Sequence, residues 1–209
     1  YLIMILIFRT GNKIAISAII ILVFIMLFDT CKNDNMDTSP QVKFKGIVFR
    51  DEIGNHLGTY AGPDDNDWKY DSIWTDEIQG IINFQDTVGL EGTYLYQTYF
   101  APAEIPFSFF PNPVANKASA YILMPGKLKV RMAMIDQDLN TVFDTSYIDQ
   151  DTSWVFLDFS DTSKFIEGFV YRLYYTFSVA GNQDFYKGHG DVFMCFQKPP
   201  ALCLDYLED

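Results

Sequence analysis

Residues 127–135 read KLKVRMAMI, and this stretch decides the fold. Apolar and basic side chains alternate along it: Leu128, Val130, Met132 and Met134 share one face of an extended chain, and Lys127, Lys129 and Arg131 share the other. A period of two with one apolar face is typical of an antiparallel strand that is buried on one side. We therefore predict a half-buried strand over residues 127–135.

The segments that follow repeat this pattern. Residues 136–140 (DQDLN) predict a turn, from which the chain returns over residues 141–144. Further strands are predicted over residues 154–159, 169–179 and 185–196, the second with alternating Phe169, Tyr171, Leu173, Tyr175 and Phe177. Short strands at this spacing, separated by turn residues, predict an antiparallel sandwich.

The preceding segment is also rich in strand signals. Residues 42–50 and 57–61 predict a hairpin, with Gly54 suited to a positive φ in the turn, and residues 93–100 predict another strand. A short helix is predicted after Thr75, which can cap it, because two acidic residues follow and Ile78, Ile81 and Ile82 share one face. The expected fold class is all-β, an antiparallel Ig-like β-sandwich with one or two short helices.

An uncharged apolar run precedes all of these strands. It extends from Ile14 to Phe28 behind Arg9 and Lys13. A membrane-spanning helix needs about 20 apolar residues, whereas a signal-peptide core of about 7–15 follows a positive flank. The run therefore predicts a hydrophobic signal helix, and Cys31 lies just beyond it.

A lone Cys at this place resembles the lipobox of bacterial lipoproteins, in which the thiol carries a diacylglycerol. The following residues 32–37 (KNDNMD) resemble the acidic surface-export signal of Bacteroidetes-type lipoproteins. This resemblance implies lipidation at Cys31 and anchoring in the outer membrane, on its periplasmic side or at the cell surface. The alternative is an uncleaved N-terminal anchor with an incidental Cys; either way, the chain is expected at a membrane.

Residues of about 110–196 resemble the Ig-like sorting domain of proteins secreted by the type IX system. The matching features are Phe110-Pro111-Asn112-Pro113, the strand-turn-strand of residues 129–143 and the strand start at residues 168–173. The likeness implies the sandwich fold. The expected organisation is a lipoprotein signal peptide (1–30), a tether (31–41), a β-rich region with a short helix (42–106), the Ig-like sandwich (107–198) and a C-terminal tail (199–209).

The charge of the chain limits its partners. Its formal net charge is -12, and an acidic surface repels phosphate backbones, so nucleic acid is excluded as an expected partner. Besides Cys31 there are two cysteines, Cys195 and Cys203. After export they either form a disulfide or remain two separate thiols, because the sequence does not fix their geometry.

An acidic loop is the candidate metal site. Asp64, Asp65, Asp67 and Asp71 could supply oxygen ligands to Ca²⁺. The full EF-hand pattern is absent, so the favoured interpretation is a solvated turn, and the default expectation is no cofactor.

The motif Gly188-His189-Gly190-Asp191 is the candidate for chemistry. His189 and Asp191 could form an acid/base pair of a hydrolase or part of a metal site. The favoured alternative is a β-bulge in the last strand, with His189 hydrogen-bonded to Asp191 or to the backbone.

Aromatic residues supply the third candidate. Trp68, Tyr70 and Trp74 could stack on sugars or grip a protein partner, or they could belong to the core. The leading functional hypothesis is an acyl-anchored, non-enzymatic lipoprotein of the outer membrane that acts through contacts with outer-membrane proteins or ligands. The alternatives are a glycan-binding accessory lipoprotein and, third, a hydrolase.

Overall fold

The computed structural model describes residues 41–62, 65–71, 74–82, 89–90 and 107–197. Residues 40–209 form one compact unit. Its elements are β1 (Ile47–Arg50), β2 (His56–Tyr60), β3 (Lys69–Tyr70), α3 (Asp76–Ile81), β4 (Phe107–Phe110), β5 (Lys117–Ile135), β6 (Thr141–Asp158), β7 (Val170–Val179) and β8 (Asn182–Phe193). The predicted signal helix, Cys31 and the predicted strand 93–100 lie outside the described residues. No helix in the described part is long and apolar enough to span a membrane.

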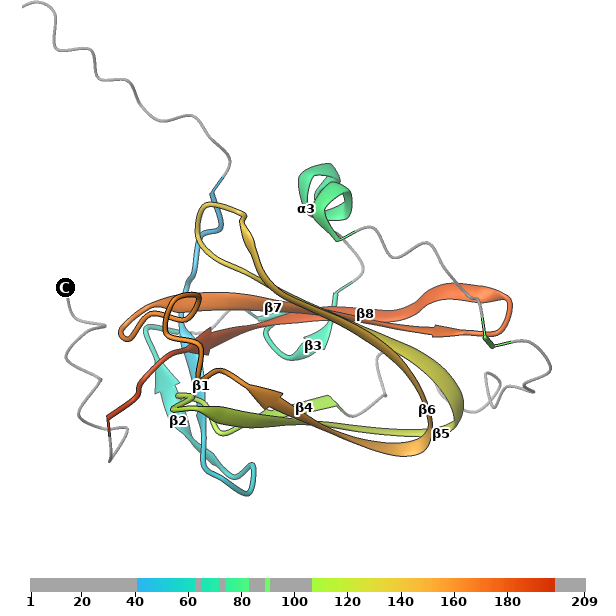
Figure 1. Cartoon of the computed structure of the whole chain (residues 1–209), viewed down its shortest axis with the longest axis horizontal. Coiled ribbons are helices and arrows are strands. Elements are labelled where there is room, and N and C mark those ends of the chain that lie inside the picture. Colours follow the sequence, from blue (N-terminus) through green and yellow to red (C-terminus); the bar gives the residue numbers. More distant parts are fainter. Residues whose placement is uncertain (1–40, 63–64, 72–73, 83–88, 91–106, 198–209) are drawn as a thin grey trace, which may run out of the picture. The chain divides into compact units, whose positions relative to one another are not determined.

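One long hairpin builds both layers of the sandwich. Strands β5 and β6 pair from Lys117↔Asp158 to Ile135↔Thr141, with a register irregularity between Leu123 and Lys127. Figure 1 shows both strands curving from the lower layer into the upper one. The first part of β5 pairs with β4 in the lower layer, and its second part pairs with β7, followed by β8 and β3, in the upper layer. The predicted all-β antiparallel sandwich is confirmed.

The sequence pattern predicts two strands where this hairpin has one. Residues 141–144 and 154–159 were expected to form two strands, but they belong to the single strand β6. The residues between them are mostly polar and have no continuous apolar face. Their backbone nevertheless continues the ladder with β5, since pairing depends on backbone groups and tolerates polar side chains on an exposed edge.

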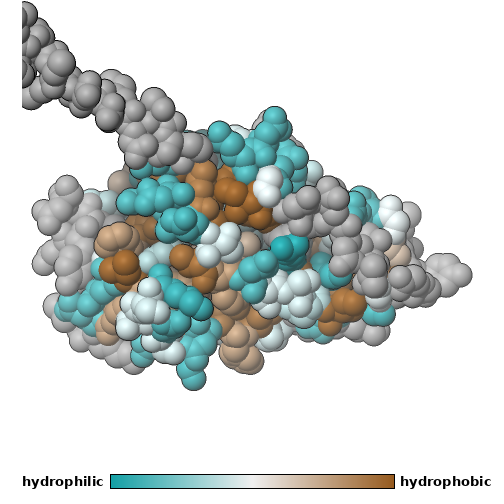
Figure 2. Space-filling view, turned by 45° about the horizontal axis from the view of Figure 1, so that its top comes forward, coloured by the Kyte–Doolittle hydropathy of each residue, from teal (hydrophilic) through white to brown (hydrophobic). Residues whose placement is uncertain are grey.

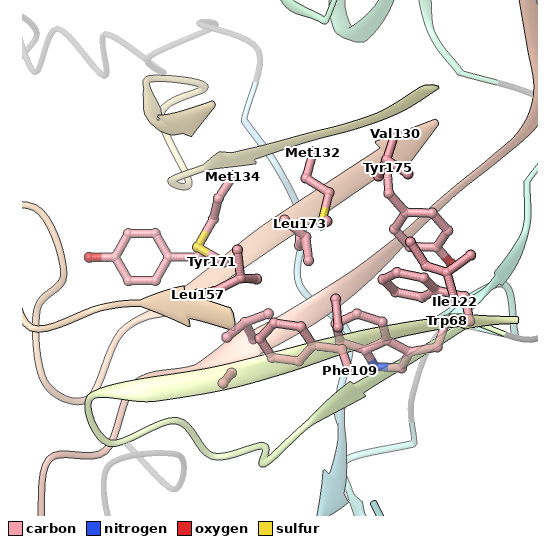
Figure 3. Packing of buried hydrophobic residues seen from close by; sticks show 14 of the residues in the cluster. Trp68, Phe109, Ile122, Val130, Met132, Met134, Leu157, Tyr171, Leu173 and Tyr175 are labelled. Atoms are coloured by element: carbon pink, nitrogen blue, oxygen red, sulfur yellow. The ribbon is translucent and has the colours of Figure 1, made fainter. Parts of the chain in front are cut away.

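The core lies between the two layers, as the alternation predicted. Leu128, Val130, Met132 and Met134 are all fully buried. In Figure 3 Val130, Met132 and Met134, together with labelled side chains of β7, face residues of the lower layer such as Phe109 across the interior. Phe107 stacks on Tyr175 with ring centroids 3.9 Å apart, which joins β4 to β7 through the core.

Helix α3 covers the other face of the upper layer. Thr75 caps it by accepting a hydrogen bond from the Ile78 amide at 3.4 Å, as predicted. Ile78 and Ile82 pack in a second cluster with Ala133, Ile135 and Tyr174. Figure 2 shows hydrophobic surface gathered beside this helix among hydrophilic side chains. The outward face of β7 is thus buried as well.

Asn112 joins the small β1–β2 sheet to the main sheet. It exchanges backbone hydrogen bonds with Arg50. Its side-chain amide donates to the carbonyls of Val48 and Asp191, both at 2.9 Å, and accepts from the Phe193 amide at 3.0 Å. The peptide bonds before Pro111 and Pro113 are cis. The Asn112 side chain is thus a buried polar link between β1 and β8.

Two turns share one hydrogen-bond pattern. In residues 51–55 and 136–140 the first Asp accepts from the amides two and four residues later, and the final Asn side chain donates back to it. The fourth position has a positive φ in both, 86° at Gly54 and 65° at Leu139. The Asp-x-x-x-Asn spacing, rather than the glycine, is the common feature.

Acid is expected to weaken the first of these turns. Hydrogen bonds, above all from the Asn55 side chain, lower the pKa of Asp51. A lowered pKa gives stability above the unfolded value of about 3.9, and that stability is lost as the pH falls through the folded-state pKa. We expect the difference in Tm between the wild type and Asp51→Asn to shrink as the pH falls from about 5 to about 2. The neighbouring Glu52→Gln is the control, and a pH-independent difference for Asp51→Asn would contradict the assignment.

Candidate functional site

The Gly-His-Gly-Asp motif lies in β8, where a short strap crosses it. The strap is residues 65–71 and includes β3, which pairs with Gly188 and His189. The Trp68 amide donates to the His189 carbonyl at 2.7 Å, and the Asp71 amide donates to the Lys187 carbonyl at 2.8 Å. The motif therefore binds a segment that lies far from it in the sequence.

The two glycines of the motif permit this close approach. A Cβ at Gly190 would overlap three ring atoms of Trp68. A Cβ at Gly188 would overlap the Lys69 carbonyl and the Tyr175 ring. Glycine is required here because the strap and its indole occupy the space that a side chain would need.

His189 pairs with the strap and not with its neighbour in the motif. Its Nδ1 lies 3.0 Å from Asp71 Oδ2, and both side chains are buried. The Tyr174 ring lies beside the imidazole, with centroids 5.7 Å apart. The bulge interpretation was wrong: the β7–β8 register is regular through the motif, and its irregularity falls between Phe177 and Val179.

Asp191 is held by a buried arginine. Arg172 Nε and Nη2 donate to its two carboxylate oxygens at 2.7 and 2.8 Å. Asp191 is 0% exposed, and its own amide donates to Asp67 Oδ1 at 2.8 Å. Burial alone would lower the pKa of Arg172, but the hydrogen bonds and charge of Asp191 outweigh it and raise that pKa. The pair is bidentate and almost completely buried.

The geometry gives the motif a positioning role. Asp71 orients His189, Arg172 holds Asp191, and Asp67 fixes the β8 backbone. Each of the two side chains thus has a hydrogen-bond partner outside the motif, Asp71 for His189 and Arg172 for Asp191.

The acidic loop is divided between surface and interior. Asp65 is exposed, whereas Asp67 and Asp71 are buried against β8. Asp64 lies outside the described residues. Within the described ranges no group of three or more His, Cys, Asp or Glu side chains is placed to hold a metal ion.

The predicted aromatic set belongs mainly to the interior. Trp68 stacks on Phe109 in the sandwich core with centroids 5.0 Å apart. Trp74 is buried edge-on against Tyr174, with Lys187 Nζ 5.1 Å from its ring. Tyr70 is half-buried and packs on Tyr186. The two indoles thus expose little ring surface to a ligand.

A different aromatic set is exposed, on the outer face of the lower layer. Trp154 is 52% exposed and Phe156 is 80% exposed, and Tyr121 is half-buried beside Trp154 with centroids 4.8 Å apart. Phe110, on the same face of β4, is buried and meets Trp154 edge-on. The sequence WVFLDF concealed this set, because apolar residues occupy both faces of the strand and alternation does not say which face is outward.

Cys195 is fully buried and disulfide-bonded. Its partner lies outside the described residues, as do Cys31 and Cys203. The pairing of Cys195 with Cys203 therefore stays a prediction.

Comparisons with known proteins add little. No protein-family model matches the chain, and no curated protein sequence matches it. One solved structure, a glycosyl hydrolase family 2 (GH2) member from Bacteroides cellulosilyticus, aligns with a TM-score of 0.28 and 9% identity. The alignment covers 72% of this chain and 25% of that chain, so this chain spans only a quarter of that enzyme. At this TM-score the likeness carries no argument about function.

Proposed function

We propose that this chain is an acyl-anchored, non-enzymatic lipoprotein of the outer membrane that works by binding. The anchoring part rests on the sequence, in which the apolar run 14–28 follows Arg9 and Lys13 and precedes Cys31. A diacylglycerol and a further acyl chain together give stable membrane attachment, where a single chain gives marginal attachment.

One observation carries the binding part of the proposal. Tyr121, Trp154 and Phe156 present aromatic rings on the outer face of the lower layer. Aromatic side chains are the usual anchors of binding surfaces, because they bury a large area with few rotatable bonds. His189 and Asp191, in contrast, are engaged inside the fold by Asp71 and Arg172, which favours a binding role over hydrolysis.

The anchor is tested by metabolic labelling. Cells that express the full chain are fed an alkyne fatty acid, and the chain is then examined by gel fluorescence and membrane fractionation. We expect labelling of the wild type and loss of both label and membrane attachment in Cys31→Ser. A Cys203→Ser variant is the matched control and should keep the label. Unchanged labelling of Cys31→Ser would refute the lipoprotein assignment.

A glycan-binding accessory lipoprotein is the second candidate. The specific observation in its favour is the exposure of Trp154 beside Tyr121, since indole and phenol rings are suited to apolar faces that also carry hydroxyls.

A further inference from the structure

The outer face of the lower layer is a small grid of cross-strand neighbours. Ser108, Tyr121 and Trp154 form one row across β4, β5 and β6, and Phe110, Ser119 and Phe156 form the next. The opposite faces of these strands fill the core with residues such as Phe109, Ala120 and Leu157. We call Ser119, Tyr121, Trp154 and Phe156 the aromatic face.

The Trp154 ring is supported by neighbouring rings on the same face. Phe110 is buried and meets the Trp154 ring at 88°, with centroids 5.8 Å apart. Tyr121 leans on the same indole at 54°. Gly54, in the β1–β2 turn, lies against the Phe110 ring, because a Cβ there would come within 3.1 Å of it. Trp154 is thus held in position before any ligand arrives, which reduces the entropy lost on binding.

Core packing does not account for the outward rings. Val155 and Leu157, on the inner face of the same strand, already contribute to the core. Phe156 nevertheless leaves 80% of its surface in water and Trp154 leaves 52%. Neighbouring exposed rings on one sheet face mark a binding surface more often than isolated exposed residues do.

The charge of the face matches an uncharged ligand. The chain carries a formal net charge of -12, yet the aromatic face contains no ionisable group except the phenol of Tyr121. At one end of the ladder Lys117 and Asp158 lie directly opposite each other and offset one another. The four side chains of the aromatic face supply no charge of their own to pair with a charged glycan or a strongly basic peptide.

We propose that the aromatic face binds a neutral polysaccharide. Pyranose rings have flat C–H faces that can stack on Trp154 and Phe156, and their hydroxyls can exchange hydrogen bonds with the Tyr121 and Ser119 hydroxyls on the neighbouring strand. Apolar rings interleaved with small hydroxyls suit a sugar better than a protein partner, whose interface adds a charged, polar rim. This inference rests on the proposed binding function and names its ligand class and surface.

The tryptophans provide a selective probe. The chain has three, of which Trp68 and Trp74 are buried and Trp154 is exposed. Acrylamide is therefore expected to quench mainly Trp154 in the detergent-solubilised full chain. Titration with mixed-linkage β-glucan, glucomannan or xyloglucan should protect this fluorescence, whereas the charged polymer polygalacturonate should not. Affinity electrophoresis with the same polymers supplies an independent readout of binding.

Variants locate the binding surface. We expect Trp154→Ala and Phe156→Ala each to weaken retardation by a neutral polysaccharide roughly tenfold or more, the loss of about one good stacking contact. Phe169→Ala, at a position that is also exposed but lies between β6 and β7, should bind as the wild type does. Thermal melting verifies that each variant folds.

The outcomes separate clearly. Retardation that survives both alanine variants would overturn the assignment of this surface and leave the binding function standing. Silence on all three neutral polymers, with Trp154 protected only as the protein concentration rises, would mean that the face pairs two copies of the chain and would overturn the ligand class. Lipid labelling at Cys31 is read independently, so the failure of the anchor and the failure of sugar binding are distinguishable.

Discussion

Asp191→Ala is expected to lower the free energy of unfolding by about 3–5 kcal/mol, the usual cost of leaving one partner of a buried ion pair alone. Arg172 would lose both hydrogen bonds to Asp191 while its guanidinium stayed buried. An arginine side chain stays protonated in proteins, so Arg172 cannot escape by releasing its proton. Urea denaturation, followed by circular dichroism, measures the loss directly.

A double variant distinguishes the ion pair from general damage to β8. Replacing both partners, as in Arg172→Met with Asp191→Leu, removes the lone charge, and such replacements of buried pairs are often close to neutral. We expect the double variant to recover much of the stability that Asp191→Ala loses. A loss below about 1 kcal/mol for Asp191→Ala would show that Arg172 reaches water and that the pair is worth no more than a surface salt bridge.

The partners of His189 and Asp191 could not be predicted from the sequence. The motif at residues 188–191 was recognised as unusual because glycines flank a His, and its neighbours suggested a His189–Asp191 pair. Residues two apart in a strand share a face, but each of them takes a partner from elsewhere: Asp71 on the strap and Arg172 on β7. The alternation of residues shows which side chains share a face of a strand. It does not show which other segment packs on that face.

The fold itself was easier to predict from the sequence. The alternation in residues 127–135 correctly placed Val130 and Met132 in the core, because a one-sided strand has only one way to bury its apolar face. Thr75 also capped α3 as predicted. The outward aromatic rings were missed for the converse reason. In residues 154–157 both faces are apolar, so the pattern does not predict which rings face water.

Gly190→Ala is the second large effect that we expect. Its Cβ would overlap the indole of Trp68, which cannot retreat because it is stacked between β8 and Phe109. Overpacking alone costs about 1–3 kcal/mol, and expulsion of a core tryptophan costs about 3–5 kcal/mol. We therefore expect a loss of about 3 kcal/mol or more in urea denaturation, with red-shifted Trp68 emission in a Trp154→Phe background.

A mutant cycle tests whether the indole is the cause. In a Trp68→Ala background the space above Gly190 is empty, so Gly190→Ala should then cost little, and the coupling between the two positions should exceed about 1 kcal/mol. Gly80→Ala is the matched control: nothing lies within 4 Å of a Cβ there, and alanine should stabilise α3 by about 0.5–1 kcal/mol. Additive losses at positions 68 and 190 would mean that the glycine serves the β8 backbone instead of the strap. The strap would then be held over the motif by its hydrogen bonds to β8, among them those of Asp67, Trp68 and Asp71.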